Sequence, residues 1–407
     1  MKNTELAKGI YWVGAIDWNI RDFHGYSTNR GSTYNAYLIV DDKITLVDTV
    51  KAKFKGELMH RIRSIIGDPK QIDYIVVNHV EMDHSGSLPE VIAEVQPEKL
   101  ICSKMGQKAL LQHFHREDWP YQVVGSGDEI KLGKHTLSFL ETRMLHWPDS
   151  MFAYVKDEQL LFSNDAFGEH LATSERFDDE VDAGVLAHET TKYYANILTL
   201  YSQQVRNLLA KVAELKLDIK TIAPDHGVIW RKDPARIIAS YKRWSNYESN
   251  GRALVIYDTM WESTRKMAFA VAEGLLEAGV PYDMFDLAVH HRSDVMTAVL
   301  DASALVLGCP TLNNGMTPHM ADYIQYMRGL RPSRKIAACF GSYGWSGESV
   351  KMMTEILQEL KMTICHPGLR VQYVPTHANL HDCVELGHTV AKATKAFLSG
   401  EQVESVI

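Results

Sequence analysis

The residues of this chain best suited to chemistry lie in one short run, His79-Val80-Glu81-Met82-Asp83-His84. The run follows an apolar, β-branched stretch from Tyr74 to Val77, which is typical of a buried strand, and it precedes a helical pattern from Ser87 to Val95. We expect an extended loop here, in which alternate side chains project to the same side. His79, Glu81 and Asp83 would then converge, while His84 would point elsewhere.

Further residues with metal-binding side chains stand directly after strand-like runs. They are His146 after Thr136 to Thr142, Asp165 after Leu160 to Phe162, and His226 after Ile222-Ala223. If these loops meet, three carboxylates about 4 Å apart would repel one another by several kcal/mol per pair at an effective dielectric near 20. Two divalent ions and a bridging hydroxide would neutralise them. Such oxygen-rich ligands suit hard, redox-active ions such as iron, whereas a set of neutral imidazoles would suit zinc.

Other histidines of the chain lack this setting. The pairs His113 and His115, His290 and His291, and His377 and His381 lie in helical or loop surroundings without converging carboxylates. We expect surface or helix-capping roles for them.

The second half of the chain alternates strand and helix patterns. Strands are predicted at Ala253 to Tyr257, Tyr282 to Phe285, Ala304 to Leu307, Ile336 to Phe340 and Val371 to Val374, and helices at Ser263 to Ala278, Ser293 to Leu300, Pro318 to Met327, Glu348 to Leu360 and Asp382 to Leu398. This βα alternation predicts a doubly wound parallel sheet.

Three loops at the carboxyl ends of these strands could hold FMN, because ligands of such sheets bind at that edge. They are Thr259-Met260-Trp261-Glu262-Ser263-Thr264, Pro310-Thr311-Leu312-Asn313-Asn314-Gly315 and Ser342-Tyr343-Gly344-Trp345-Ser346-Gly347. The first offers hydroxyls and backbone N–H groups to a phosphate at a helix N-terminus. It lacks glycine, and Glu262 adds a negative charge. The third loop has small residues and aromatic rings suited to a flat isoalloxazine.

The first half has short strand patterns with occasional helices, which favours an α+β or layered-sheet domain. Strands are predicted at Tyr37 to Val40, Thr45 to Val47, Thr136 to Leu140 and Gln159 to Phe162, and a helix at Tyr193 to Leu215. The polar stretch from Ser245 to Arg252 is the best linker candidate, and we place the boundary near residue 250.

Composition excludes several classes of protein. At 407 residues the chain is long enough for two or three domains, and its 45% hydrophobic content allows large cores. A net charge of -8 argues against nucleic acid as a partner. The five cysteines show no Cys-x-x-Cys spacing, no apolar run is long enough to span a membrane, and Met1 to Ile10 does not resemble a signal peptide. We expect a cytoplasmic protein.

The hexad and the residues after it resemble the metallo-β-lactamase superfamily, whose usual hydrolase motif is H-x-H-x-D-H. Glu81 departs from that motif, and a glutamate there followed by a flavodoxin-like half is the pattern of flavodiiron proteins. The similarity extends over nearly the whole chain. It includes Gly14 to Trp18, Leu145 to Ser150, Ser163 to Asp165, Pro224 to Gly227 and the three loops. It implies a metallo-β-lactamase-like αββα di-iron domain at 1–250 and a flavodoxin-like FMN-binding domain at 251–407.

The resemblance also implies roles for individual residues. One iron would be held by His79, Glu81 and His146, the other by Asp83 and His226, with Asp165 bridging, while His84 matches a position that ligates in some members only. Trp147, Tyr193 and Tyr194 would line the substrate pocket.

The function implied is an oxidoreductase that reduces O2 to water, NO to N2O, or both, and so scavenges these gases in an anaerobe. Reduced FMN carries two electrons and a diferrous centre two more, which is the number that O2 needs. A zinc hydrolase fused to an electron-transfer flavodoxin is the alternative, although it leaves the flavodoxin half idle. A non-catalytic electron carrier would leave the hexad idle.

Partners follow from the same resemblance. Since no Cys-x-x-Cys pair follows the flavodoxin half, we expect a separate electron donor, either a rubredoxin or a reduced deazaflavin coenzyme. A head-to-tail homodimer, or a dimer of such dimers, would bring the flavin of one chain to the iron of its partner.

Overall fold

The computed structural model describes residues 4–407 and divides into two compact units. Unit 1 takes the chain up to Tyr194 together with Tyr201–Lys242, and unit 2 takes Ala195–Leu200 and Arg243–Ile407. The domain ranges 1–250 and 251–407 remain a prediction. The expectation about the N-terminal segment concerns in part residues 1–3, which lie outside the described range.

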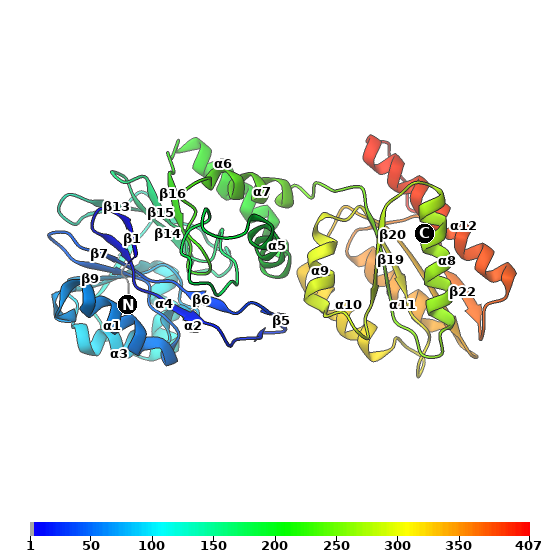
Figure 1. The fold of residues 1–407 in the computed structure, drawn as a ribbon, viewed down its shortest axis with the longest axis horizontal. Helices are drawn as coiled ribbons and strands as arrows, with labels where there is room; N and C mark the ends of the chain where they lie inside the picture. Colours follow the sequence, from blue (N-terminus) through cyan, green and yellow to red (C-terminus); the bar gives the residue numbers. More distant parts are fainter. Residues whose placement is uncertain (1–3) are drawn as a thin grey trace. The chain divides into compact units, whose positions relative to one another are not determined.

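Unit 1 contains two sheets packed face to face (Figure 1). The first has the order β1-β2-β7-β8-β9-β10-β11, antiparallel as far as β8 and parallel from β8 onward. Its strands are β1 Thr4–Ala7, β2 Ile10–Trp12, β7 Tyr37–Ile39, β8 Thr45–Val47, β9 Tyr74–Val77, β10 Lys99–Ser103 and β11 Tyr121–Val124. Two small ribbons add β3 Ala15–Asp17 with β6 Ser32–Tyr34, and β4 Asp22–Phe23 with β5 Tyr26–Ser27.

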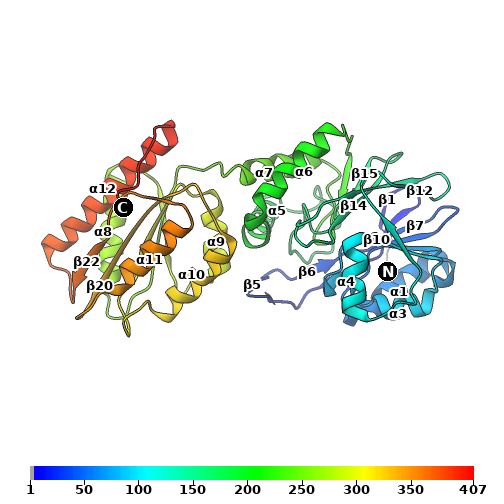
Figure 2. The ribbon, with the colours of Figure 1, turned by 180° about the vertical axis from the view of Figure 1, so that it is seen from behind.

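The second sheet has the order β12-β13-β14-β15-β16 and is antiparallel except for the last pair. Its strands are β12 Glu129–Lys131, β13 Thr136–Glu141, β14 Met151–Val155, β15 Leu160–Phe162 and β16 Thr221–Ala223. One buried cluster joins the facing sides of the two sheets, for example Tyr37 and Val76 with Phe139 and Phe162. Helices cover the outer faces (Figures 1 and 2), so the layers run helix, sheet, sheet, helix.

The helices of unit 1 fall into two groups. Those beside the first sheet are α1 Lys55–Ile66, α2 Met82–Ser85, α3 Leu88–Val95 and α4 Lys104–Phe114, with short 3-10 turns at Ala52–Phe54 and Pro69–Gln71. The others, α5 Ala183–Tyr193, α6 Ser202–Glu214 and α7 Pro234–Ser245, come after β15 in the chain.

The continuous helix predicted from Tyr193 to Leu215 is wrong. Helix α5 ends at Tyr193, a π turn covers Tyr194–Leu198, a 3-10 turn covers Thr199–Tyr201, and α6 then begins. Both tyrosines are fully buried. A π turn widens the backbone at one point, so neighbouring residues can both face the interior, which a regular helical stripe does not allow.

Unit 2 is a parallel sheet with the order β18-β17-β19-β20-β21, and β22 also pairs with β20. The strands are β17 Ala253–Tyr257, β18 Tyr282–Asp286, β19 Ala304–Gly308, β20 Ile336–Tyr343, β21 Thr363–Ile364 and β22 Leu369–Gln372. The helices are α8 Ser263–Glu277, α9 Arg292–Asp301, α10 Pro318–Leu330, α11 Glu348–Glu359 and α12 His377–Ser399. This is the flavodoxin-type strand order.

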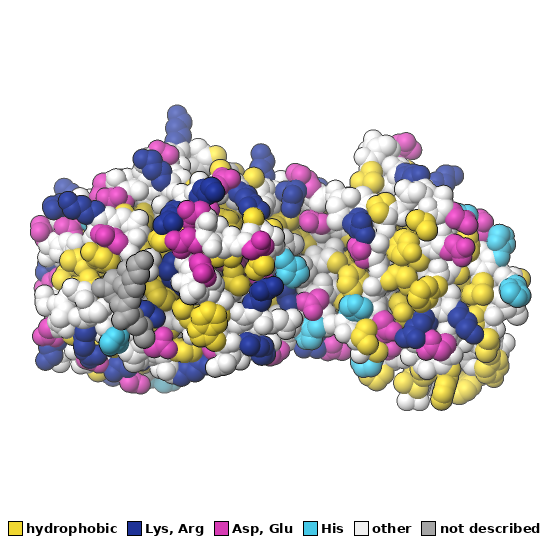
Figure 3. All heavy atoms as spheres, viewed as in Figure 1, with side chains coloured by type: hydrophobic (Ala, Val, Ile, Leu, Met, Phe, Trp, Pro, Cys, Tyr) yellow, Lys and Arg dark blue, Asp and Glu magenta, His cyan; other side chains and the backbone are white. Residues whose placement is uncertain are grey.

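Both faces of this sheet are covered. Leu254 and Ile256 join a cluster with α9, α10 and α11, while their neighbours Ala253 and Val255 join another with α8 and α12. Alternate residues of one strand thus enter opposite cores. Hydrophobic side chains also reach the surface of unit 2 (Figure 3), and on α8 Phe269 and Leu276 are exposed.

Four elements of unit 2 differ from their predicted bounds by two or more residues: β20 extends to Tyr343 rather than Phe340, α10 extends to Leu330 rather than Met327, and α12 and β22 differ as follows. Helix α12 begins at His377 rather than Asp382, because Thr376 and Asn379 form a reciprocal capping box. Strand β22 ends at Gln372 rather than Val374. No helix among the residues described is long and apolar enough to cross a membrane.

Candidate functional site

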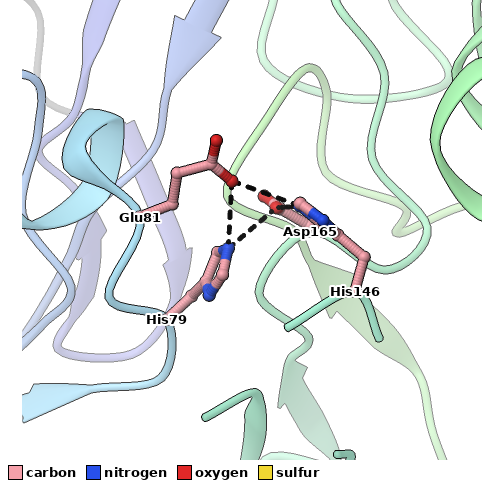
Figure 4. Close-up of side chains that lie close together, drawn as sticks. All are labelled: His79, Glu81, His146 and Asp165. Carbon is pink, nitrogen blue, oxygen red and sulfur yellow. Dashed lines mark hydrogen bonds and ion pairs between the residues drawn. The ribbon is translucent and has the colours of Figure 1, made fainter. Parts of the chain in front are cut away.

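One group of potential ligands gathers at the carboxyl ends of β9 and β15 (Figure 4). It consists of His79, Glu81, His146 and Asp165, which come from three separate loops. Nε2 of His79 and of His146 lie 3.4 and 3.3 Å from Oε2 of Glu81. The same two nitrogens lie 3.4 and 2.8 Å from Oδ2 of Asp165.

A second group lies on the other side of Asp165. Its members are Asp83, His84 and His226. Oδ1 of Asp165 is 3.1 Å from Nε2 of His84 and 3.4 Å from Nε2 of His226. Nε2 of His226 is also 3.3 Å from Oδ2 of Asp83. One carboxylate therefore faces the first group with one oxygen and the second group with the other.

The expectation that His84 points elsewhere is wrong. It assumed an extended loop, but Met82–Ser85 form the short helix α2. Neighbouring residues of a helical turn diverge by less than those of a strand. Asp83 and His84 thus both reach the second group, and the rings of His84 and His226 lie 4.7 Å apart.

The far nitrogens of two ligand histidines are held by oxygen atoms. Asp225 lies 3.8 Å from Nδ1 of His84, which is beyond hydrogen-bond distance. Nδ1 of His79 lies 3.0 Å from Oδ2 of Asp149, and Nδ1 of His226 lies 2.6 Å from the carbonyl oxygen of Thr33. Such contacts turn Nε2 toward the centre of the site. Sequence reasoning missed Asp149 and Asp225, whose only signal is a carboxylate close in sequence to a ligand histidine.

The turn that presents His226 requires glycine at the next position. Gly227 has φ +80°, and a Cβ there would lie 2.2 Å from Oε1 of Glu169. A side chain would displace Glu169, whose Oε1 accepts a hydrogen bond from the backbone N–H of Val228.

The field within the site favours positive charge. Burial lowers the pKa of His79, but Asp149 and Asp165 outweigh it and hold that pKa well above its usual value. Burial also lowers the pKa of His84, but the negative charges of Asp83 and Asp165 outweigh that effect and raise the pKa to about 10. Burial raises the pKa of Asp165, yet the His84 charge and the bond from His146 bring it well below its usual range. The carboxylates therefore stay ionised and attract cations.

The donor set fits metal ions. Both carboxylate oxygens of Asp83, both ring nitrogens of His84 and Oδ1 of Asp165 are buried without a hydrogen-bond partner in the protein. Buried polar atoms of this kind cost free energy unless a ligand satisfies them. Carboxylate-rich ligand sets mixed with imidazole suit iron better than zinc.

Of the three residues expected to line a substrate pocket, Trp147 and Tyr193 lie beside ligand histidines, whereas Tyr194 packs against Tyr241. The half-buried ring of Trp147 lies 5.3 Å from that of His79, and the ring of Tyr193 lies 6.1 Å from that of His226. The ring of Tyr194 instead packs 5.0 Å from that of Tyr241, and its hydroxyl is 3.1 Å from that of Ser202.

One histidine beside the site was missed: His170 is buried, with its ring 4.7 Å from that of His226. His113 is exposed, as expected, and its ring also stacks on that of Trp147 at 6.3 Å. Of the remaining histidine pairs, His291 caps α9 by accepting a hydrogen bond from the N–H of Ser293, as a capping role predicts.

Unit 2 has a cavity of about 470 Å³ at the carboxyl edge of its sheet. Its lining comes from all three predicted loops: Met260, Trp261, Ser263, Pro310, Thr311, Leu312, Asn313, Asn314, Ser342, Tyr343, Gly344, Trp345 and Ser346, joined by Tyr373 and Val374, which the sequence did not single out. Thr259, Glu262, Thr264, Gly315 and Gly347 lie outside the lining. A cavity of this size with aromatic walls suits a flat ring system.

The first loop has features that fit a phosphate. Oγ1 of Thr259 is buried without a hydrogen-bond partner, and Ser263 begins α8, whose N-terminus favours an anion. The negative charge of Glu262 is offset by Arg265, because NH1 of Arg265 lies 2.8 Å from Oε2 of Glu262.

Comparison with known proteins agrees with this layout. A model described as the ODP family beta lactamase matches residues 33–227, and the flavodoxin model matches residues 255–387, which confirms the predicted fold class. A nitric oxide reductase of Moorella thermoacetica is 48% identical over 95% of this chain and 97% of its own.

Solved structures give the same picture. The rubredoxin oxygen:oxidoreductase of Desulfovibrio gigas has a TM-score of 0.96 and 44% identity, covering 98% of this chain and 100% of its own. A flavodiiron protein from Giardia intestinalis has a TM-score of 0.94 and 34% identity, covering 98% of each chain.

Proposed function

Since the chain belongs to the flavodiiron proteins, we propose that it passes electrons from FMN to a di-iron centre and there reduces O2 to water, NO to N2O, or both. The observation that carries this proposal is the position of Asp165 between two ligand groups in a chain that also holds a flavodoxin-type cavity. The named relatives are oxidoreductases, so the zinc-hydrolase alternative has no support from them.

The ligand assignment follows the two groups. His79, Glu81 and His146 would hold one iron, and Asp83, His84 and His226 the other. Asp165 would bridge, one oxygen to each metal. When bound, the irons would bind and reduce the gas, and FMN would return electrons to them.

The protein's own part in this chemistry is to orient the ligand histidines and to enclose the space in which the gas binds. Asp149 fixes His79 so that Nε2 faces the centre, and the carbonyl of Thr33 does the same for His226. Trp147 and Tyr193 would bound the space in which the gas binds. Fixed ligands of this kind need little rearrangement as the metals change charge.

In the flavin cavity, the roles divide by loop. Thr259 and Ser263 would bind the phosphate at the start of α8. Trp261 and Trp345, which are 88% and 86% exposed, would flank the ring and become covered by it. An apolar surface of this extent at a cavity mouth is typical of a ligand site.

The electron donor would be a separate protein of the rubredoxin type, in line with the name of the D. gigas relative, with a reduced deazaflavin coenzyme as the second candidate. A cytoplasmic location is consistent with five cysteines that are all free and buried.

The assembly would be a head-to-tail homodimer, alone or paired into a tetramer. Exposed Phe269 and Leu276 on α8 give unit 2 an apolar surface that a partner could cover. Sedimentation at assay concentration should give a dimer or tetramer, and a fully active monomer would contradict this assembly.

Metal and flavin analysis with gas consumption tests the function. The purified protein, expressed with ample iron, should contain about two irons per chain, show the yellow spectrum of oxidised flavin, and consume O2 or NO when reduced. Two zincs per chain together with amide or thioester hydrolysis would overturn the proposal.

A further inference from the structure

Rows of aromatic rings usually belong to a hydrophobic core, but one row in unit 1 begins at the metal ligands. The ring of Trp147 lies 5.3 Å from that of His79 and 6.3 Å from that of His146. Trp147 also stacks on His113, with ring centroids 6.3 Å apart and planes 16° from parallel. An indole therefore connects the ligand histidines to helix α4.

The row continues past α4 to the edge of the first sheet. The rings of His113 and Phe114, the last two residues of α4, are 5.9 Å apart. Phe114 is 5.5 Å from Trp119, and Trp119 is 6.2 Å from Tyr121. Tyr121 begins β11, the edge strand.

We propose that this row, from Trp147 through Trp119 to Tyr121, conducts oxidising equivalents from the metal centre to the protein surface. The inference rests on the proposed reduction of O2 at that centre. The row would supply electrons to the metal centre when O2 has bound there but too few electrons have arrived from the flavin.

The electron balance is as follows. Trp147 gives one electron to the oxidant formed from O2 at the centre, and Trp119 refills the Trp147 radical cation. Tyr121 then refills Trp119 and releases its phenol proton to water, which leaves a neutral tyrosyl radical. A soluble thiol reduces this radical by giving a hydrogen atom, and two thiyl radicals combine into a disulfide. Each passage delivers one electron to the centre.

The surroundings of the last two rings favour outward transfer. Trp119 is 5% exposed and its indole N–H has no hydrogen-bond partner, so its radical cation cannot readily lose a proton. The hydroxyl of Tyr121 donates to the carbonyl of Arg116 at 3.1 Å in exposed surroundings, where its proton can leave.

Tyr193, whose ring lies 6.1 Å from that of His226, lacks such an exit. Tyr193 is fully buried, and its hydroxyl has no hydrogen-bond partner in the protein. A radical formed there could not release its proton, since no acceptor lies within reach.

The test uses the iron- and FMN-loaded protein, reduced with one equivalent of a two-electron reductant per chain, mixed with O2 and frozen within milliseconds. Electron paramagnetic resonance should detect a tyrosyl radical. Tyr121→Phe should remove that signal, and Trp119→Phe should move the radical to a tryptophan. Tyr11→Phe, which changes a half-buried tyrosine of β2 outside the row, is the matched control and should leave the signal intact.

A second measurement follows damage during turnover. In excess O2 with limiting reductant, Tyr121→Phe should inactivate several-fold faster than the control at an unchanged initial rate, and peptide mass spectrometry should find more oxidised Trp147. A radical signal as intense in Tyr121→Phe as in the unchanged protein would show that the row does not conduct oxidising equivalents. O2 consumption without any protein radical would show the same. Consumption of NO but not of O2 would remove the premise of the row, whereas consumption of neither gas would overturn the proposed function itself.

Discussion

At the scale of single residues, the site depends on groups that hold a ligand in place as well as on the ligands. Asp149 contacts His79 through the same Oδ2 that accepts the backbone N–H of Val80. It thereby ties one ligand histidine to the loop that carries Glu81. Loss of such a partner typically weakens metal binding about 10- to 100-fold.

We therefore predict graded losses of iron. Asp165→Ala removes a ligand shared by both groups and should reduce the iron content to well below half, and Glu81→Ala should also lose much of the iron. Asp149→Asn should load fully but release iron to a chelator about 10- to 100-fold more readily. Asp179→Asn, an exposed partner of Arg231, is the control. If Asp149→Asn and the control retain iron equally well against the chelator, the contact between Asp149 and His79 is not needed for iron binding.

At the scale of elements, the helices of unit 2 differ in how closely they pack. Gly274 of α8 and Gly387 of α12 face each other, and a Cβ on Gly274 would lie 2.1 Å from the carbonyl oxygen of Val384. The two helix backbones thus approach to a distance that only glycine permits. In α10, a Cβ on Gly329 would meet nothing within 4 Å.

Gly274 and Gly329 make a matched pair of positions for substitution. Gly274→Ala should destabilise unit 2 by about 1–3 kcal/mol, since the helices must move apart, whereas Gly329→Ala should be neutral or stabilising by up to about 1 kcal/mol. Urea denaturation followed by release of flavin fluorescence measures both. A neutral Gly274→Ala would mean that the α8–α12 contact is loose in solution.

The sequence predicts these elements unevenly, for physical reasons. The buried strands β17 and β19 and the helix α8 follow from periodicity alone, because each residue's face is set by a regular repeat. The π turn after Tyr193 and the short helix at Met82–Ser85 are local departures from that repeat. His84 was misplaced and His170 was missed for this reason, since their positions depend on backbone geometry and long-range packing.

At the scale of the whole molecule, the flavin-binding half has hydrophobic cores of its own, although Asn196 from an earlier segment also bonds Ser293 and Tyr326. Among the residues described, both of its hydrophobic clusters consist of residues from Ala253 onward. A domain with its own core can fold alone.

We therefore predict that a fragment from Arg252 to Ile407 folds and binds FMN. Circular dichroism should show a mixed α/β spectrum, and flavin fluorescence should be quenched on titration at micromolar FMN. A fragment that folds without binding FMN would mean that the three loops are wrongly assigned.

The intact protein should reduce O2 completely. Four electrons are available when FMN and both irons are reduced, so little hydrogen peroxide should escape, and about two equivalents of a two-electron donor should be used per O2. Catalase added to an oxygen electrode after O2 is exhausted checks this. Return of half the consumed O2 would identify peroxide as the product.

The position of Asp165 between the two ligand groups has a thermodynamic consequence. A metal ion in one group would fix the orientation of this carboxylate, and the second ion would then bind to a ligand already in place, so the two binding events should be positively coupled. Under limiting iron, the population should divide into empty chains and fully loaded ones, with few chains holding a single ion. Native mass spectrometry during an iron titration distinguishes this from independent filling, in which singly loaded chains dominate at the midpoint.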